Sequence, residues 1–136
     1  MDFFLAKTDP DTYSIVRFAQ EQKTCWDGVS NPQALRAIRQ MKPGDLVFIY
    51  HSGREAGICG MAKVISFPRE DTRTPKLSVI DLEFVTMLDP PMTLKEIKDS
   101  GEFDDWSLVK QARLSTMTAP PKFVAMMRKK YPGKIG

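Results

Sequence analysis

The fold class follows from residues 43–50, which read Pro-Gly-Asp-Leu-Val-Phe-Ile-Tyr. The first three residues are typical of a turn, because Pro fixes φ, Gly permits positive φ and Asp hydrogen-bonds to nearby backbone. Leu46 to Tyr50 then form an uninterrupted apolar run, too short for a helix and of the usual length of a strand. A run without a polar face is buried on both sides. We therefore predict a central strand here, within a larger sheet.

Two later stretches predict further strands of this sheet. Ile58–Phe67 is largely apolar, and Gly60 and Ala62 put small residues on one face, where another element can pack closely. Leu77–Val85 alternates between apolar and polar residues, which is typical of a strand with one buried face. The polar segment Pro68–Pro75 between them is expected to be an exposed loop.

Shorter signals complete the expected order of elements. Phe3–Ala6 is expected to be an edge or first strand, Lys23–Ser30 a loop, and Gln111–Met117 a late strand. Helix starts are indicated by caps, a capping box and N-terminal prolines. They lie at Ser14, Asn31-Pro32, Thr93 to Glu96, and Pro120-Pro121. About five strands and four helices in this irregular order indicate an α+β fold with a curved, barrel-like mixed sheet.

The length of 136 residues predicts one domain, spanning residues 1–136. With 42% hydrophobic and 27% charged residues, the composition is that of an ordinary globular domain. No apolar run reaches the roughly 18–20 residues of a membrane span, and the protein is not expected to bind a membrane. The N-terminus has an acid where a signal peptide has basic residues. A cytoplasmic location is therefore expected.

The metal-binding and thiol residues are few. Cys25, Cys59 and His51 cannot form a closed Cys/His zinc site, so neither a metal nor another cofactor is expected. A reducing compartment disfavours a disulfide between the two cysteines, and we expect both thiols to be buried.

The positive charge lies mainly at one end of the chain. Lys110 to Gly136 carries seven basic residues and no acid, while the remainder carries 13 basic and 17 acidic residues. Such clustering is typical of a protein that binds a polyanion, although a solvated helix with a basic tail has the same pattern. The residues expected to contact a nucleic-acid backbone are Arg36, Arg39, Lys122, Arg128, Lys129 and Lys130.

No phosphate-binding glycine loop or zinc-protease motif is present. A lone His51 or Cys25 is more often structural than catalytic, and the chain is expected not to be an enzyme. The unusual feature is Trp26 beside Asp27 and Gly28. It is either a lid on the core or a stacking surface for a flat ligand, with Asp27 and Asn31 as hydrogen-bonding partners.

Several short pieces, taken together, resemble the EVE domain of the PUA-like superfamily. The matching pieces run along most of the chain. They are Lys7-Thr8-Asp9-Pro10, Tyr13-Ser14, Trp26-Asp27-Gly28-Val29 with Asn31, Met41 to Asp45, Tyr50-His51-Ser52, Gly57-Ile58 with Gly60 and Ala62, and Arg113-Leu114-Ser115.

This resemblance implies a distorted mixed β-barrel of about five to six strands flanked by helices. It also implies a reader of a modified base in DNA or RNA, related to YTH domains. The ligand would be a methylated or hydroxymethylated cytosine, or a methyladenine, held in an aromatic pocket. The implied ligand-binding residues are Lys7, Thr8, Trp26, Asp27, Asn31, Tyr50, His51, Ser52, Phe67, Arg113, Leu114 and Ser115, with Phe67 as a second aromatic wall.

Two other functions remain open. Some PUA-like relatives, the ASCH group, resemble small amidohydrolases that act on modified nucleosides through Lys, Thr and an acid. Lys7 and Thr8 have the right chemistry, but neighbours on a strand are expected to point to opposite faces. The same pocket could instead serve a small-molecule sensor. A monomer is expected in each case.

Overall fold

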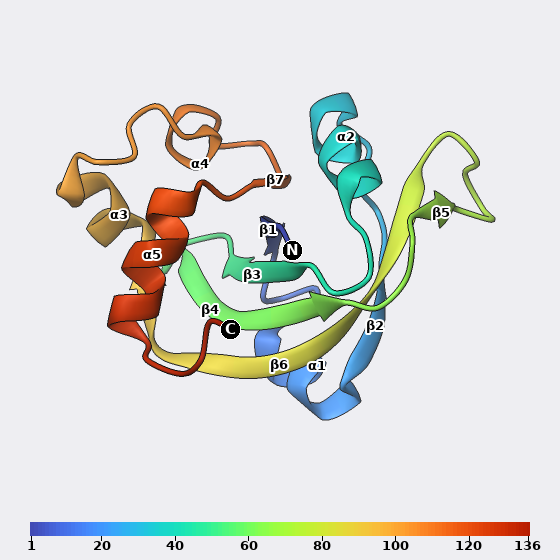
Figure 1. The fold of residues 1–136 in the computed structure, drawn as a ribbon. Coiled ribbons are helices and arrows are strands. Elements are labelled where there is room, and N and C mark those ends of the chain that lie inside the picture. The colour runs from blue at the N-terminus through green and yellow to red at the C-terminus, as the bar shows by residue number, and fades with distance from the viewer.

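A computed structural model describes residues 1–136 as one mixed sheet of seven strands with five helices around it (Figure 1). The sheet order is β2-β6-β4-β3-β1-β7, and β5 pairs with β6. The strands are β1 (Phe3–Thr8), β2 (Lys23–Trp26), β3 (Leu46–His51), β4 (Gly57–Val64), β5 (Arg69–Glu70), β6 (Ser78–Thr93) and β7 (Thr116–Thr118). The helices are α1 (Ile15–Glu21), α2 (Pro32–Gln40), α3 (Leu94–Ser100), α4 (Ser107–Lys110) and α5 (Pro121–Lys130). The α+β prediction is confirmed.

The predicted central strand is β3, which lies between β1 and β4. It runs parallel to β1, with Leu5 opposite Phe48, and antiparallel to β4. Strand β1 is the first strand but is not at an edge, because the short β7 pairs with its other side. Buried Leu5, Phe48 and their neighbours make this pair the centre of the core.

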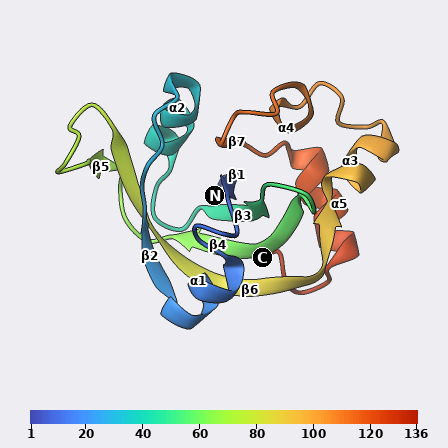
Figure 2. The same ribbon diagram turned by 180° about the vertical axis from the view of Figure 1, so that it is seen from behind.

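The sheet curves strongly, and α2 lies near both β6 and β7 (Figures 1 and 2). Helix α2 therefore covers the opening between the two ends of the sheet. It begins where predicted, because Asn31 Oδ1 accepts hydrogen bonds from the Gln33 and Ala34 N–H groups, and Pro32 occupies the first helical position.

Strand β6 is much longer than the predicted Leu77–Val85. Of its 16 residues, the first two pair with β5, the next four with β2, and those from Leu82 onward with β4, with two shifts of register along β4. Irregularities of this kind bend and twist a strand. The loop prediction for residues 68–75 was nearly right, although Arg69 and Glu70 form the two-residue β5.

The prediction of a strand over Gln111–Met117 holds only for its last two residues. Only Thr116–Thr118 forms a strand, β7, while α4 precedes it and the Leu114 N–H donates to the Gln111 carbonyl in a turn. The helix starts at Ser14 and Thr93 are confirmed, since each hydroxyl accepts the backbone N–H three residues on. No helix is long and apolar enough to cross a membrane.

The core is one continuous cluster of 36 buried residues. At one end of the molecule, Phe103 and Trp106 pack against Phe123 of α5. At the other side, α1 rests on β4 at Gly60. A Cβ there would lie 2.5 Å from the Ile15 Cδ1 atom, so the small residue permits the close approach of helix and strand.

Candidate functional site

A pocket of about 430 Å³ opens where the end of β1, the start of α1 and strand β2 converge. This volume is within the roughly 300–1,000 Å³ of small-molecule sites. Its lining mixes aromatic, charged and hydroxyl side chains. The lining residues are Lys7, Thr8, Thr12, Tyr13, Arg17, Glu21, Thr24, Cys25, Trp26, Asp27, Gly28, Val29 and Ser115. Five predicted site residues are thus brought together: Lys7, Thr8, Trp26, Asp27 and Ser115.

Trp26 does not lie in the loop that the sequence predicted. It is the last residue of β2 and pairs with Ile80 of β6. Its side chain is only 8% exposed, with its ring centroid 6.2 Å from that of Tyr13 and 6.4 Å from that of Phe18. Trp26 therefore forms the inner wall of the pocket and is also part of the core.

Tyr13 is a lining residue that the sequence analysis did not select. Its hydroxyl donates to Glu21 Oε1 at 2.7 Å, and the Arg17 guanidinium lies 5.3 Å from its ring centroid. Burial raises the pKa of Tyr13, and the hydrogen bond from Tyr13 lowers the pKa of Glu21. These contacts hold the half-buried ring at the pocket wall. The only sequence signal for them is the spacing of Arg17 and Glu21, four residues apart on a helix.

Lys7 and Thr8 both line the pocket, although they are neighbours on β1. The expectation that they face apart does not hold, because Thr8 is the last residue of its strand. The Lys7 Nζ donates to the Ala112 carbonyl at 3.0 Å and lies 5.3 Å from the Tyr50 ring centroid, and burial lowers its pKa. The Thr8 hydroxyl donates to the Tyr13 carbonyl at 2.8 Å.

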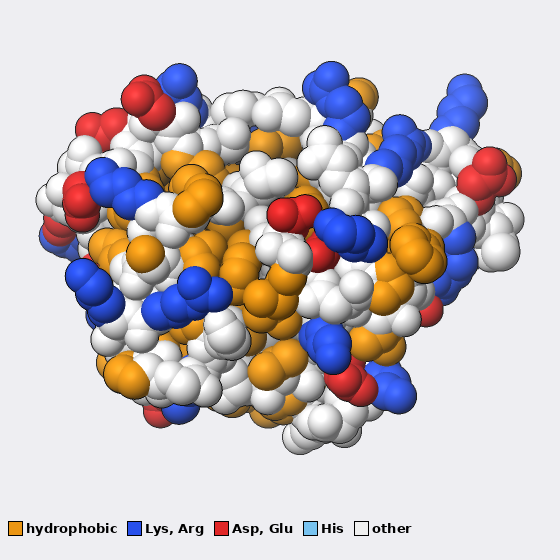
Figure 3. Space-filling model, in the orientation of Figure 1, with side chains coloured by type: hydrophobic (Ala, Val, Ile, Leu, Met, Phe, Trp, Pro, Cys, Tyr) orange, Lys and Arg blue, Asp and Glu red, His pale blue; other side chains and the backbone are white.

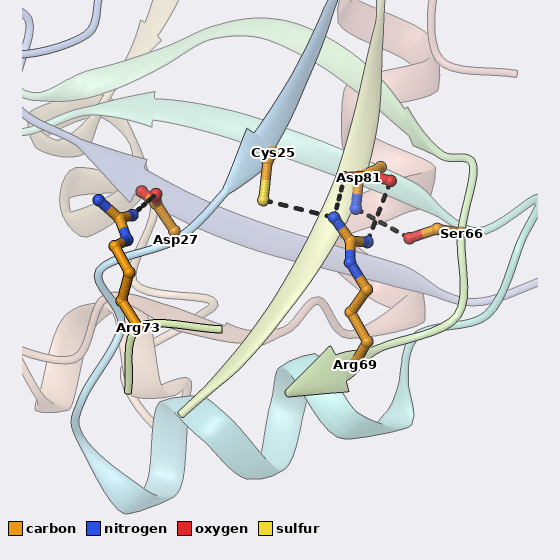
Figure 4. Close-up of polar contacts among 6 residues, drawn as sticks. All are labelled: Cys25, Asp27, Ser66, Arg69, Arg73 and Asp81. Carbon is orange, nitrogen blue, oxygen red and sulfur yellow. Dashed lines mark hydrogen bonds and ion pairs between the residues drawn. The ribbon is translucent and has the colours of Figure 1, made fainter. Parts of the chain in front are cut away.

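Asp27 stands at the rim of the pocket and is held from outside it. Its Oδ2 lies 3.0 Å from Nη2 of Arg73, which comes from the β5–β6 hairpin (Figure 4). The Asp27 side chain is 47% exposed and that of Arg73 is 77% exposed. A second arginine of the same hairpin, Arg69, binds both oxygens of Asp81 at 2.9 and 3.0 Å.

The predicted residues at the end of β3 and directly after it lie outside this pocket. Tyr50 is buried beneath Lys7. His51 Nε2 accepts the Ile15 N–H at 3.0 Å, and burial lowers its pKa, so neutral His51 caps α1. Ser52 donates weakly to the Thr8 carbonyl. His51 and Ser52 line a separate, wider groove of about 1,280 Å³ beside the β3–β4 loop.

Four further predicted residues do not reach the pocket. Asn31 is occupied as the cap of α2. Phe67 follows the end of β4, points to solvent and is 69% exposed, so it is no second wall. Arg113 is exposed and Leu114 is buried in the core.

The cysteines are both free, and only Cys59 is buried. The prediction of a buried Cys25 was wrong, because β2 is an edge strand and its alternate residues face outward. The Cys25 Sγ lies 3.7 Å from Nη2 of Arg69 (Figure 4). No group of three or more His, Cys, Asp or Glu side chains is placed to hold a metal ion.

The model of the EVE domain family matches residues 2–130, nearly the whole chain. The chain belongs to the EVE domain family. Zebrafish (Danio rerio) thymocyte nuclear protein 1 is 33% identical over 119 residues, which cover 69% of this chain and 52% of that protein. The human protein is 36% identical over 95 residues, which cover 57% of this chain and 42% of that protein. The chain spans about half the length of the curated relatives it matches.

Solved structures share the fold of this EVE domain. A Pseudomonas syringae protein is 28% identical, with a TM-score of 0.85, and the match covers 94% of this chain and 99% of that one. Human THYN1 protein, solved in complex with 5-methylcytosine-containing DNA, is 27% identical with a TM-score of 0.84, and 97% and 100% of the chains are covered. The mixed sheet and the flanking helices of this chain agree with those of these solved structures.

The basic residues predicted to contact a nucleic-acid backbone lie in two separate regions of this EVE domain, on α2 and on α5. Helices α3, α4 and α5 form one end of the molecule, while β2, α2 and the β5 hairpin form the other (Figures 1 and 2). Strand β2 also lines the pocket. The α5 cations are mostly engaged: Lys122 with Glu102, Lys130 with Glu96, and Arg128 with the Gly136 carbonyl, whereas Lys129 is exposed. Arg36 and Arg39 are on α2. The α5 residues predicted to contact a nucleic-acid backbone therefore lie away from the pocket.

Proposed function

We propose that this chain is a nucleic-acid-binding module that takes a modified cytosine, 5-methylcytosine in DNA, into the 430 Å³ pocket. The observation that carries the proposal is the composition of that pocket. It combines the aromatic side chains of Tyr13 and Trp26 with a cation, Lys7, and a rim carboxylate, Asp27. A base removed from its stack is held by aromatic surfaces and by hydrogen bonds to its edge.

Each side of a cytosine has a counterpart in the pocket. The Asp27 carboxylate only accepts hydrogen bonds, and the 4-amino group of cytosine only donates. Lys7 uses one N–H on the Ala112 carbonyl and has others for the base carbonyl oxygen. The buried Val29 and Trp26 offer apolar surface to a 5-methyl group. The hydroxymethylated base and methyladenine also carry amino groups, and are the competing ligands.

The likeness to human THYN1 protein supports this proposal, because that protein was solved with 5-methylcytosine-containing DNA and the match covers nearly all of both chains. The chain has only part of the length of its curated relatives, so the proposal concerns this domain alone.

The test uses fluorescence anisotropy with short DNA duplexes that differ at one base. Thymine has the same 5-methyl group as 5-methylcytosine but a carbonyl oxygen in place of the amino group. We expect 5-methylcytosine to be preferred over both cytosine and thymine, and Asp27→Asn to weaken the preference over thymine by about tenfold, since an amide can donate to that carbonyl. Asp105→Asn, at an exposed site on the other end of the molecule, is the matched control. Equal binding of all three duplexes by the wild type would refute the proposal.

A second candidate function rests on one observation. Lys7 and Thr8 share the pocket, and burial lowers the pKa of Lys7, as an ASCH-like amidohydrolase on acylated nucleosides would require. We favour a binding role without catalysis, because the Thr8 hydroxyl donates its only hydrogen to the Tyr13 carbonyl of the chain. Chromatography of acylated nucleosides after incubation with the protein separates the two, since only an enzyme releases the free nucleoside.

A further inference from the structure

The hairpin that joins β5 to β6, residues 69–77, projects beyond the sheet at the same end of the molecule as β2 and α2 (Figure 1). Strand β2 lines the pocket. Residues 72–76 at its tip are all exposed. Figure 3 shows Lys and Arg side chains gathered over α2 and this hairpin. The cations are Arg36, Arg39, Arg69, Arg73 and Lys76, and the acids beside them are Asp27, Glu70, Asp71 and Asp81.

The base of the hairpin is firmly held. Arg69 forms a two-point ion pair with Asp81, whose N–H donates to the Ser66 hydroxyl (Figure 4). On the other strand, Arg39 of α2 donates to the Lys76 carbonyl and to the Ser78 hydroxyl. The hairpin is thus attached both to the sheet and to α2. Its tip has a defined position relative to the pocket.

Arg73 is the residue that connects the hairpin tip to the pocket. Its Nη2 lies 3.0 Å from Asp27 Oδ2, and its Nε lies 3.9 Å from Asp71 Oδ1. A guanidinium has five N–H donors, and a side chain that is 77% exposed keeps the rest available. Arginine binds phosphate well, because its planar fork matches two phosphate oxygens.

The ion pair with Asp27 is easily exchanged. Exposed ion pairs contribute little to stability, so breaking this one costs little. The two groups also have matching partners in a nucleotide, a phosphate for Arg73 and the base amino group for Asp27.

We propose that Arg73 is the phosphate-binding residue of this pocket, and that it exchanges Asp27 for a backbone phosphate when the base enters. The proposal rests on the proposed function. Before binding, Arg73 neutralises the rim carboxylate, which would otherwise repel the strand. After binding, Asp27 holds the base and Arg73 holds the phosphate, so base entry and backbone contact are coupled.

The test is the salt dependence of binding to the 5-methylcytosine duplex, measured for wild type, Arg73→Gln and Lys95→Gln. Lys95 is a matched control: it is exposed, paired with Asp99, and at the other end of the molecule. One lost phosphate contact reduces the slope of log K against log salt by about 0.9. We expect Arg73→Gln to show that reduction and about tenfold weaker binding at low salt, and Lys95→Gln to show neither.

In a second measurement, a substitution is expected to strengthen binding instead of weakening it. On a duplex with an abasic site, Asp27 has no base to hold and only competes with phosphate for Arg73. We expect Asp27→Asn to bind that duplex about two- to fivefold more tightly than the wild type. Weaker or equal binding would overturn the exchange.

The two proposals fail differently. A wild type without any preference for the methylated duplex refutes the proposed function. A wild type with that preference, whose Arg73→Gln variant keeps the full salt slope, refutes only the role of Arg73. Because phosphate contacts carry no sequence information, Arg73→Gln should leave the ratio of methylated to unmethylated binding unchanged. A changed ratio would place Arg73 on the base instead.

Discussion

Replacing Gly60 with alanine tests whether close packing of α1 on β4 shapes the pocket. The added Cβ would lie 2.5 Å from Ile15 Cδ1, 2.9 Å from Ile15 Cγ1 and 3.0 Å from the Thr86 carbonyl oxygen. Ile15 is buried, so its side chain has little room to turn aside. Helix α1 must move outward, and with it Tyr13 and Arg17 at the pocket wall.

Overpacking a core by one methyl group costs about 1–3 kcal/mol. With an unfolding entropy of about 2.1 cal/mol/K per residue, a chain of 136 residues loses about 3.5 °C of melting temperature per kcal/mol. Gly60→Ala should therefore melt about 3–10 °C below the wild type. Its binding to the 5-methylcytosine duplex should weaken by a larger factor than its fraction of unfolded protein explains.

The assay is a double-mutant cycle with Ile15→Ala, read by thermal and urea unfolding. Ile15→Ala alone costs about 2–5 kcal/mol of stability. It also removes the two atoms closest to the added Cβ, so the double variant should lose less stability than the two single variants lose together. Gly57→Ala is the control on the same strand, because its Cβ would meet the Met92 carbonyl oxygen at 2.7 Å and Ile15→Ala cannot relieve that contact. Additive losses for Gly60→Ala and Ile15→Ala would refute the packing argument.

Further predictions concern buried groups and thiols. Trp26→Ala should cost about 3–5 kcal/mol of stability in urea unfolding, because the ring belongs to the core; a variant as stable as wild type would contradict that placement. Burial keeps the pKa of His51 below its ordinary 6.5, so the unfolded state takes up more protons. The contribution of His51 is complete above about pH 6.5 and is lost as pH falls, by at most about 1.4 kcal/mol per pH unit, and His51→Gln should flatten this dependence. A thiol reagent should titrate exposed Cys25 in the native protein but Cys59, with a pKa raised to about 12, only after unfolding; two reactive native thiols would refute this.

Local signals in the sequence predicted the local structure. Ser14, Asn31 and Thr93 cap helices through atoms two or three residues away, so their roles are readable from the sequence alone. The apolar run ending at Tyr50 likewise predicted the central strand, because burial on both faces leaves no polar position.

Tertiary contacts decided the features that were missed. Strand β2 reads Lys-Thr-Cys-Trp and has little strand pattern of its own. It forms a strand because it pairs with the early half of β6. Trp26 therefore lies in a strand, where the sequence predicted a loop. Arg73 is 46 residues from Asp27, and an exposed arginine in a polar loop carries no sign of its partner. Five pocket residues from three distant segments were predicted, because the resemblance to the EVE domain matched those segments together. Tyr13 and the contact between Arg73 and Asp27 were missed, because no local pattern marks them.

The pairing of β1 with β7 has a consequence for synthesis on the ribosome. Phe4 lies opposite Thr118 and Leu5 opposite Met117, so the first strand of this domain pairs with its last strand. The nascent chain carries β1 with an unpaired edge until residue 118 has emerged, and long-range pairings of this kind form slowly. An edge left open in this way invites pairing with another chain. Truncations that stop before β7 should therefore aggregate, while ones that remove only residues 131–136 leave the pairing of β1 with β7 in place.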